Sequence, residues 1–161
     1  MKKVLYLHGL ESGQGGPKVD YLADKCYVHA PEMDYTRKDI FPYLVHIMED
    51  FDPDLIIGSS MGGYAAYMLS GFYGTPIIAF NPALHSRKFN PKFPNKVQTY
   101  YPGKAKIILG EEDTVIDPKQ TLRFIADHIG NGFPKIDIDK VDGMGHRVPL
   151  DIFINKIKYE L

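Results

Sequence analysis

A serine placed between two glycines is the residue of this sequence most able to do chemistry. Residues 58–62 read Gly-Ser-Ser-Met-Gly, the G-x-S-x-G pattern. Ser60 fits the register, whereas Ser59 does not, because the residue two places before it is Ile57. In this pattern the serine sits on a sharp strand-to-helix turn, and side chains two places before and after it would collide. The pattern predicts Ser60 as a nucleophile for acyl transfer; the alternative is a glycine-rich helix start with an incidental serine.

A serine hydroxyl needs a base within hydrogen-bond reach, and that base needs an orienting acid. Where this pattern is catalytic, the three residues follow the chain order Ser, Asp or Glu, then His. Two of the six histidines, His128 and His146, come late enough in the chain. His128 lies in a helical pattern, whereas His146 lies in the turn "DGMGHRV", directly after the last expected strand. Because catalytic groups gather in such loops, we predict His146 as the base.

Several carboxylates could serve as the acid. Four of them follow the strand expected at 105–109: Glu111, Glu112, Asp113 and Asp117. Asp117 precedes Pro118 and therefore looks like a helix N-cap, a structural role that would occupy its carboxylate. Asp113 lies in the preceding loop, free to turn toward His146, and is the predicted acid. Asp142, four residues before His146, remains a second candidate.

The glycine-rich turn in "YLHGLESGQGGPK", residues 6–18, could in principle grip a phosphate. A dinucleotide-binding G-x-G-x-x-G pattern starting at Gly13 would need a glycine where Lys18 stands. A P-loop needs Gly-Lys-Ser/Thr, but Pro17 separates Gly16 from Lys18. The turn therefore fails both tests for a phosphate-binding loop.

The same turn is well placed to stabilise an oxyanion. Acyl transfer needs two N–H donors aimed at the oxygen of the tetrahedral intermediate. We expect one from Met61, the residue after the nucleophile, and the other from Leu10 in the loop after the first strand. Only the backbone of these two residues would matter. His8 and Gly9, which precede Leu10, are expected to border the substrate.

These residues need a scaffold of alternating strands and helices. Apolar runs predict strands at 4–8, 26–30, 55–58, 76–80, 105–109 and 136–141. Helical patterns cover 17–25, 37–51, 61–72, 118–129 and 150–161. Such alternation implies βαβ units, and therefore an α/β fold with a mostly parallel sheet of about six strands and helices on both faces. We expect a single domain over residues 1–161.

Composition excludes several functional classes. The chain has 161 residues and a formal net charge of -1, which argues against a nucleic-acid partner. The single cysteine, Cys26, permits no internal disulfide and suits a reducing compartment. No apolar run approaches the ~20 residues of a membrane span, and Val4–Leu7 is too short for a signal peptide. We expect a cytoplasmic protein without a membrane span; its oligomeric state stays open.

One stretch, residues 82–109, is strongly basic. It contains no acidic residue and six basic ones: Arg87, Lys88, Lys92, Lys96, Lys104 and Lys106. One interpretation is a solvated loop with aromatic anchors. The other is a short cap over 82–104, a basic and aromatic flap that admits anionic substrates, with Lys88 and Phe89 contacting them.

Five ordered stretches together resemble the small bacterial YqiA-like esterases of the α/β-hydrolase superfamily: "VLYLHGLESGQGGPK", "IIGSSMGGYAAYMLS", "IAFNPAL", "GEEDTVIDPKQ" and "GMGHRV". The resemblance implies a compact hydrolase of carboxylic esters, including acyl thioesters such as acyl-CoA. Its nucleophile, acid and base fall on Ser60, Asp113 and His146. The segment between Asn81 and Gly110 is shorter and more basic than in these relatives, so acyl-chain preference does not transfer.

Three alternative functions stay open at this point, and one is nucleic-acid binding through the basic residues between Arg87 and Lys106, against which the near-neutral net charge argues. The same three residues would serve an amidase or peptidase, and a non-catalytic binding protein could keep the fold. The sequence contains neither H-E-x-x-H nor a cysteine cluster, so we expect no zinc site and no other cofactor. The expected partner is a small-molecule ester or an acyl-CoA-like substrate.

Overall fold

The computed structural model describes residues 1–94, 104–128 and 136–161, and within them the strands form one parallel sheet. Its order is β2-β1-β3-β4-β5-β6, and every neighbouring pair is parallel. The strands are β1 (Lys3–Leu7), β2 (Tyr27–His29), β3 (Leu55–Ser59), β4 (Ile77–Phe80), β5 (Ala105–Gly110) and β6 (Ile136–Val141). The prediction of a mostly parallel, six-stranded α/β sheet is confirmed.

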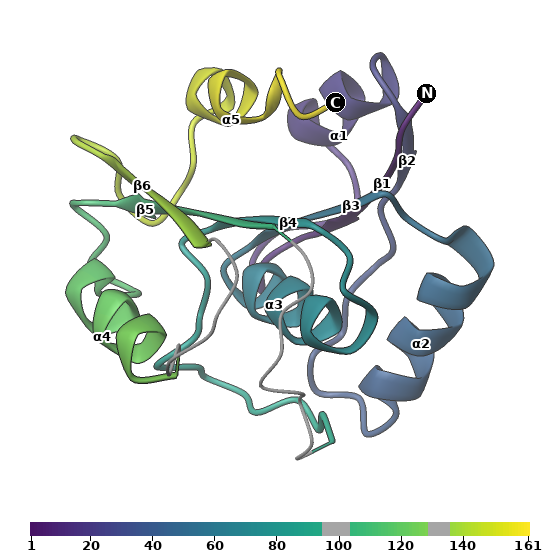
Figure 1. Cartoon of the computed structure of the whole chain (residues 1–161), viewed down its shortest axis with the longest axis horizontal. Helices are drawn as coiled ribbons and strands as arrows, with labels where there is room; N and C mark the ends of the chain where they lie inside the picture. Colours follow the sequence, from purple (N-terminus) through teal and green to yellow (C-terminus); the bar gives the residue numbers. More distant parts are fainter. Residues whose placement is uncertain (95–103, 129–135) are drawn as a thin grey trace.

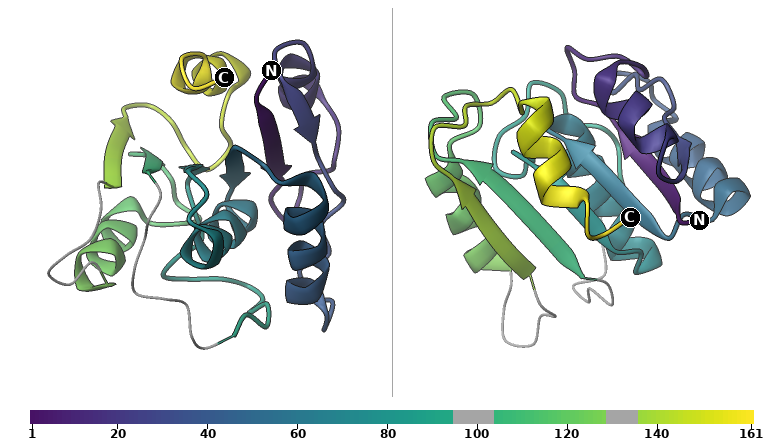
Figure 2. Two further views of the ribbon diagram at one scale, coloured as in Figure 1. Left: turned by 45° about the vertical axis from the view of Figure 1, so that its right-hand side comes forward. Right: turned by 90° about the horizontal axis from the view of Figure 1, so that it is seen from above.

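Helices cover both faces of this sheet. They are α1 (Pro17–Ala23), α2 (Ile40–Phe51), α3 (Met61–Tyr73), α4 (Pro118–His128) and α5 (Leu150–Ile157). Figure 1 shows α2, α3 and α4 on one face and α1 and α5 on the other. Helices α1 and α5 lie side by side, as the view from above in Figure 2 also shows. Of the helices described, none has the length and apolar character needed to cross a bilayer.

The core is split in two by the sheet. Successive side chains of a strand point to opposite faces, so a strand covered on both sides is apolar throughout. In β3, Ile56 packs into the cluster beneath α2 and α3, whereas Ile57 packs into the cluster beneath α1 and α5. Both are fully buried. This two-sided burial explains the continuous apolar runs of the central strands.

The register brings the carboxyl ends of the strands to one edge of the sheet. Leu7 of β1 pairs with Gly58 of β3, and Ser59 at the end of β3 pairs with Phe80 at the end of β4. Gly110, at the end of β5, pairs with Val141 at the end of β6. The loops that leave these strands therefore emerge together, and they carry Ser60, Asp113 and His146.

Two helix boundaries differ from the expectation by more than two residues. The helix expected from residue 37 begins at Ile40, because Asp34 accepts hydrogen bonds from the N–H and Oγ1 of Thr36 and forms a turn there. The last helix ends at Ile157 rather than at residue 161. The expected end of the fourth helix at residue 129 lies outside the described residues.

Residues 82–94, the first part of the basic stretch, contain no helix or strand and pack against α2 and α3. The ring of Phe93 lies 5.7 Å from that of Phe41 and 5.7 Å from that of Tyr64. The guanidinium of Arg87 lies over Tyr64 at 4.1 Å. Residues 95–103, with Lys96, lie outside the described residues, so the cap over 82–104 stays a prediction.

Candidate active site

Ser60 lies on the sharp turn between β3 and α3. Its backbone has φ 55° and ψ −115°, a sparsely populated conformation for a residue other than glycine. Its N–H donates to the carbonyl of Phe80 at 2.9 Å, and its own carbonyl accepts the N–H of Ala83 at 3.0 Å. Such a conformation costs about 1–3 kcal/mol and persists only when the surroundings hold it. Here Phe80, at the end of β4, and Ala83, shortly after it, hold Ser60 through these two hydrogen bonds.

The two glycines of the turn are required by close backbone contacts. A Cβ at residue 62 would overlap the carbonyl of Leu7, at the end of β1. A Cβ at residue 58 would overlap the backbone of Gly62 itself. A side chain at either position would therefore clash, as expected. At residue 62 it would clash with the neighbouring strand β1.

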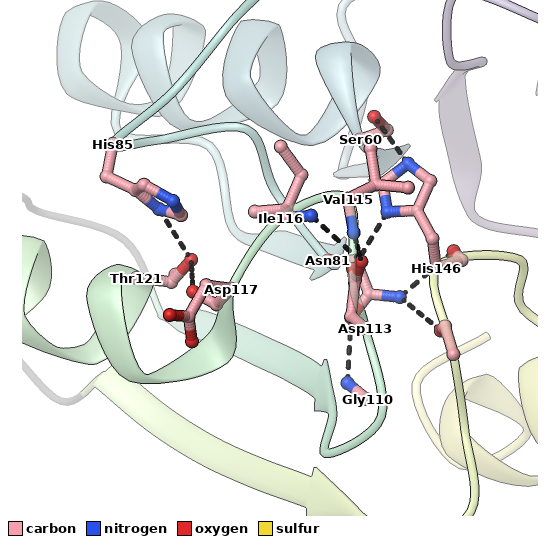
Figure 3. A network of polar contacts seen from close by, with 11 residues as sticks. Ser60, Asn81, His85, Gly110, Asp113, Val115, Ile116, Asp117, Thr121 and His146 are labelled. Carbon is pink, nitrogen blue, oxygen red and sulfur yellow. Dashed lines mark hydrogen bonds and ion pairs between the residues drawn. The ribbon is translucent and has the colours of Figure 1, made fainter.

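His146, in the loop between β6 and α5, reaches the serine with its imidazole. Nε2 of His146 lies 3.1 Å from Oγ of Ser60, and Nδ1 lies 2.8 Å from Oδ2 of Asp113 (Figure 3). The side chain of Asp113 is fully buried, whereas that of His146 is 27% exposed. The base candidate is thus open to solvent on one side and fixed on the other.

The two oxygens of the Asp113 carboxylate have different partners. Oδ1 accepts the backbone N–H groups of Val115 and Ile116, both at 2.8 Å. Oδ2 is left for His146. Because an ionised carboxylate only accepts hydrogen bonds, it selects the tautomer of His146 that carries its proton on Nδ1. Nε2 of His146 is then an acceptor that faces the hydroxyl of Ser60.

The other acid and base candidates lie elsewhere. Asp117 caps α4, since its Oδ1 accepts the N–H of Lys119 at 2.8 Å, and this bond is the main cause that lowers the pKa of Asp117. Glu112 and Asp142 are exposed, and His128 is the last residue of α4. Within the three described ranges, no group of three His, Cys, Asp or Glu side chains is arranged as metal ligands would be.

His8 is buried, and both of its ring nitrogens are occupied. Nδ1 lies 2.7 Å from the carbonyl of Gly9, and Nε2 accepts the N–H of Met33 at 3.0 Å. The ring therefore has no nitrogen left for a substrate, and that His8 borders the substrate stays a prediction. Its role is to fix the loop after β1.

That loop passes close to the serine. A Cβ on Gly9 would lie 3.3 Å from Cβ of Ser60. The Gly9 carbonyl is held by the His8 ring, and because the peptide is planar and trans, this also fixes the direction of the Leu10 N–H. Met61 is the first residue of α3, so its N–H has no acceptor within the helix. Both expected oxyanion donors thus belong to backbone that is held in place.

Lys88 and Phe89, expected to contact substrate, lie in the basic stretch. Lys88 is exposed, with Nζ 5.7 Å from the centre of the Phe89 ring. Phe89 lines a cavity of about 210 Å³ formed by residues 35–38 and 89–92. Ser60 and His146 are not among the residues that line this cavity. The structure therefore places Phe89 at a cavity that neither Ser60 nor His146 lines, and contact of Lys88 and Phe89 with a substrate stays a prediction.

Asn81 is a buried polar residue to which the sequence analysis assigned no role. It directly follows β4 and has a positive φ of 43°. Its Nδ2 donates to the carbonyls of Gly145 and His146, both at 3.0 Å, and its Oδ1 accepts the N–H of Gly110 at 2.7 Å. The available signal was an asparagine directly after a buried strand, since asparagine tolerates left-handed backbone better than most residues.

Three solved structures with a similar fold are hydrolases by name. The monoacylglycerol lipase of Paleococcus ferrophilus is 14% identical, with a TM-score of 0.73 over 98% of this chain and 93% of its own. A candidate hydrolase of the alpha/beta superfamily from Xanthomonas campestris pv. campestris is 19% identical, with a TM-score of 0.70 over 100% of both chains. MGS-MChE2, an alpha/beta hydrolase enzyme from a sediment metagenome of the Mar Chica lagoon, is 16% identical, with a TM-score of 0.66 over 99% of this chain and 88% of its own.

At these identities the likeness shows a shared fold, the α/β-hydrolase fold. A family model gives the relationship in sequence. The model of the Uncharacterised protein family (UPF0227) matches residues 3–101, which include β1, the turn at Ser60 and Asn81. The protein therefore belongs to this family, the YqiA-like family to which its sequence motifs point.

Proposed function

We propose that this protein is a serine hydrolase that cleaves carboxylic esters or acyl thioesters, with Ser60 as nucleophile, His146 as base and Asp113 as acid. The observation that carries the proposal is the chain of two hydrogen bonds, 3.1 Å from Ser60 to His146 and 2.8 Å from His146 to Asp113. Three residues from three different loops meet in the order that nucleophilic catalysis requires.

Acylation follows from this geometry. Oγ of Ser60 attacks the acyl carbon while Nε2 of His146 takes the hydroxyl proton. The ionised Asp113 stabilises the imidazolium that forms. Collapse of the tetrahedral intermediate breaks the bond to the leaving group, which departs as an alcohol or thiol with the proton from His146. An acyl-enzyme ester on Ser60 remains.

Deacylation repeats the same steps with water. His146 takes a proton from water, whose oxygen attacks the acyl carbon. The second intermediate collapses to a carboxylic acid, and the proton returns from His146 to Oγ of Ser60. In both intermediates the N–H groups of Leu10 and Met61 hold the oxyanion. One such donor is worth about 2.7–4 kcal/mol of transition-state stabilisation.

The basic stretch supports an anionic substrate such as an acyl-CoA. Lys88 is exposed, and Lys92 lines the cavity beside Phe89. Replacing Lys88, Lys92 and Lys96 by glutamine should raise KM for an acyl-CoA more than KM for a neutral ester of the same acyl chain. An equal effect on both substrates would remove anionic recognition while leaving the hydrolase proposal intact.

Turnover of a substrate panel tests the proposal. The panel contains p-nitrophenyl esters of increasing chain length, a thioester and an amide with the same acyl group. The wild type should hydrolyse esters and thioesters, Ser60→Ala should not, and the matched control Ser59→Ala should stay active. Preferred cleavage of the amide would favour an amidase, and a folded wild type without turnover would favour a binding protein.

A further inference from the structure

The short segment Phe80–Ala83, which begins with the last residue of β4, contacts both the serine and the histidine of the site. Its backbone holds Ser60 through the carbonyl of Phe80 and the N–H of Ala83. Between these two contacts, the side chain of Asn81 points toward the loop of His146, as Figure 3 shows. This four-residue segment therefore contacts both Ser60 and the loop of His146. The distance between the hydroxyl of Ser60 and the imidazole of His146 would control proton transfer from one to the other.

The amide of Asn81 is saturated by backbone groups of two loops. Its two donors go to the carbonyls of Gly145 and His146, and its acceptor takes the N–H of Gly110. The residue is 1% exposed, so water cannot substitute for a lost partner without rearrangement. Since a buried group left unsatisfied costs about 1–3 kcal/mol, this amide fixes both loops firmly.

The loops that Asn81 joins are themselves packed against each other. The N–H of Glu112 donates to the carbonyl of Met144 at 3.1 Å. A Cβ on Gly110 would overlap that same carbonyl, so only glycine permits this approach. The acid loop and the histidine loop thus form one unit, and Asn81 attaches this unit to the segment that holds Ser60.

We infer that Asn81 is a positioning residue, whose amide sets the distance between Oγ of Ser60 and Nε2 of His146 by binding the His146 loop to the Phe80–Ala83 segment. This inference rests on the proposed function. Asparagine suits the position because its backbone tolerates the observed φ of 43° and its side chain offers donors and an acceptor together. Aspartate lacks the donors, and glycine has the backbone freedom but no amide.

Asn81→Gly separates the two contributions, because it keeps the left-handed backbone and removes only the amide. We expect kcat for an ester to fall roughly a hundredfold, the size of effect that a 1 Å misplacement of a reacting group produces. KM should change little. The far-downfield NMR signal of the Nδ1 proton of His146 should broaden or disappear. A variant that is merely less stable but still folded would keep this signal.

Asp52→Gly is the matched control. Asp52 also has a positive φ, 48°, but it lies at the end of α2, and its N–H donates to Met48. This variant should keep the kcat and the Nδ1 proton signal of the wild type. If Asn81→Gly does not fold, Asn81→Asp preserves the size of the side chain and the acceptor for Gly110, and it should show the same loss of kcat.

Two results would overturn the inference. One is a folded Asn81 variant with the kcat and Nδ1 proton signal of the wild type. The other needs no variant: rapid solvent exchange of the Asn81 amide protons in wild-type protein would mean that the amide is not fixed. Ester hydrolysis that survives in Ser60→Ala would instead overturn the proposed function itself, so the two failures are distinguishable.

Discussion

At the scale of single residues, the two oxygens of the buried Asp113 carboxylate have different functions: one fixes the carboxylate, and the other binds His146. The N–H groups of Val115 and Ile116 occupy Oδ1, so the carboxylate cannot rotate without losing two hydrogen bonds. Oδ2 is held against Nδ1 of His146. The orientation of the imidazole toward Ser60 therefore depends on a turn of four residues.

Asp113→Asn tests this division of tasks. The two N–H donors should hold the amide oxygen at the Oδ1 position, which turns the NH₂ group toward His146. His146 would then carry its proton on Nε2 and could not accept one from Ser60. We expect kcat to fall roughly 10⁴-fold with the fold intact, measured by ester turnover and by circular dichroism.

Asp117→Asn is the control for that substitution. Asn caps helices about as well as Asp, so α4 and the activity should both be retained. An Asp113→Asn variant as active as Asp117→Asn would mean that the charge of Asp113 is not used.

The sequence singled out Ser60, Asp113 and His146 through motif and chain order, and these are the side chains within hydrogen-bond distance of one another. Asn81 could not be found in that way. Its partners, Gly145 and His146, lie 64 and 65 residues further along the chain. Only the sheet order, which places β4, β5 and β6 next to one another, brings the loop after β6 close to Asn81.

At the scale of elements, the turn between β3 and α3 depends on close contact with β1. Gly62→Ala should push α3 away from the Leu7 carbonyl and displace Ser60. We expect a loss of stability of about 1–3 kcal/mol in urea unfolding, together with a loss of ester turnover. Gly13→Ala is the matched control, since a Cβ there meets nothing within 4 Å. Equal behaviour of the two variants would contradict the role of this contact.

Residues 82–94 form the second element whose position matters. Phe93 makes ring contacts with Phe41 of α2 and Tyr64 of α3. Phe93→Leu should lower the free energy of unfolding by about 1–3 kcal/mol, because each aromatic pair contributes about 0.5–1.5 kcal/mol. Turnover of a short ester should stay close to that of the wild type. An unchanged melting temperature would show that the stretch is not anchored by this ring.

The strands could be predicted from their continuous apolar runs and the helices from apolar residues at helical spacing. The boundary of α2 could not, since the turn around Asp34 depends on a side chain that competes with the helix backbone. The path of residues 82–94 could not be predicted from the sequence either, because it is set by aromatic contacts with two separate helices.

At the scale of the whole molecule, alternation of strands and helices predicts a parallel sheet but not the order of its strands. The parallel orientation of all six strands brings the loops that follow them to one edge, and helices cover both faces of the sheet. Tyr6, in the cluster beneath α1 and α5, lies in edge-to-face contact with Phe153. Burial raises the pKa of Tyr6 from 10.0 to about 12.

This shift predicts sensitivity to alkali. Below pH 10 the phenol is protonated in both the folded and the unfolded protein. Between about pH 10 and 12 only the folded state keeps the proton, so stability falls as pH rises, by about 3 kcal/mol for two pKa units. Tyr6→Phe should weaken this loss in urea unfolding measured across pH 9–12, roughly the range of the two pKa values. Tyr27→Phe, at an exposed site, should follow the wild type.

The central claim is that Ser60 is made reactive by His146. The most direct measurement is the rate of reaction with a fluorophosphonate probe, followed by mass-spectrometric mapping of the adduct. The account predicts one adduct, on Ser60, that forms much more slowly in His146→Ala and is absent in Ser60→Ala. An adduct on another residue, or labelling of His146→Ala at the wild-type rate, would contradict it.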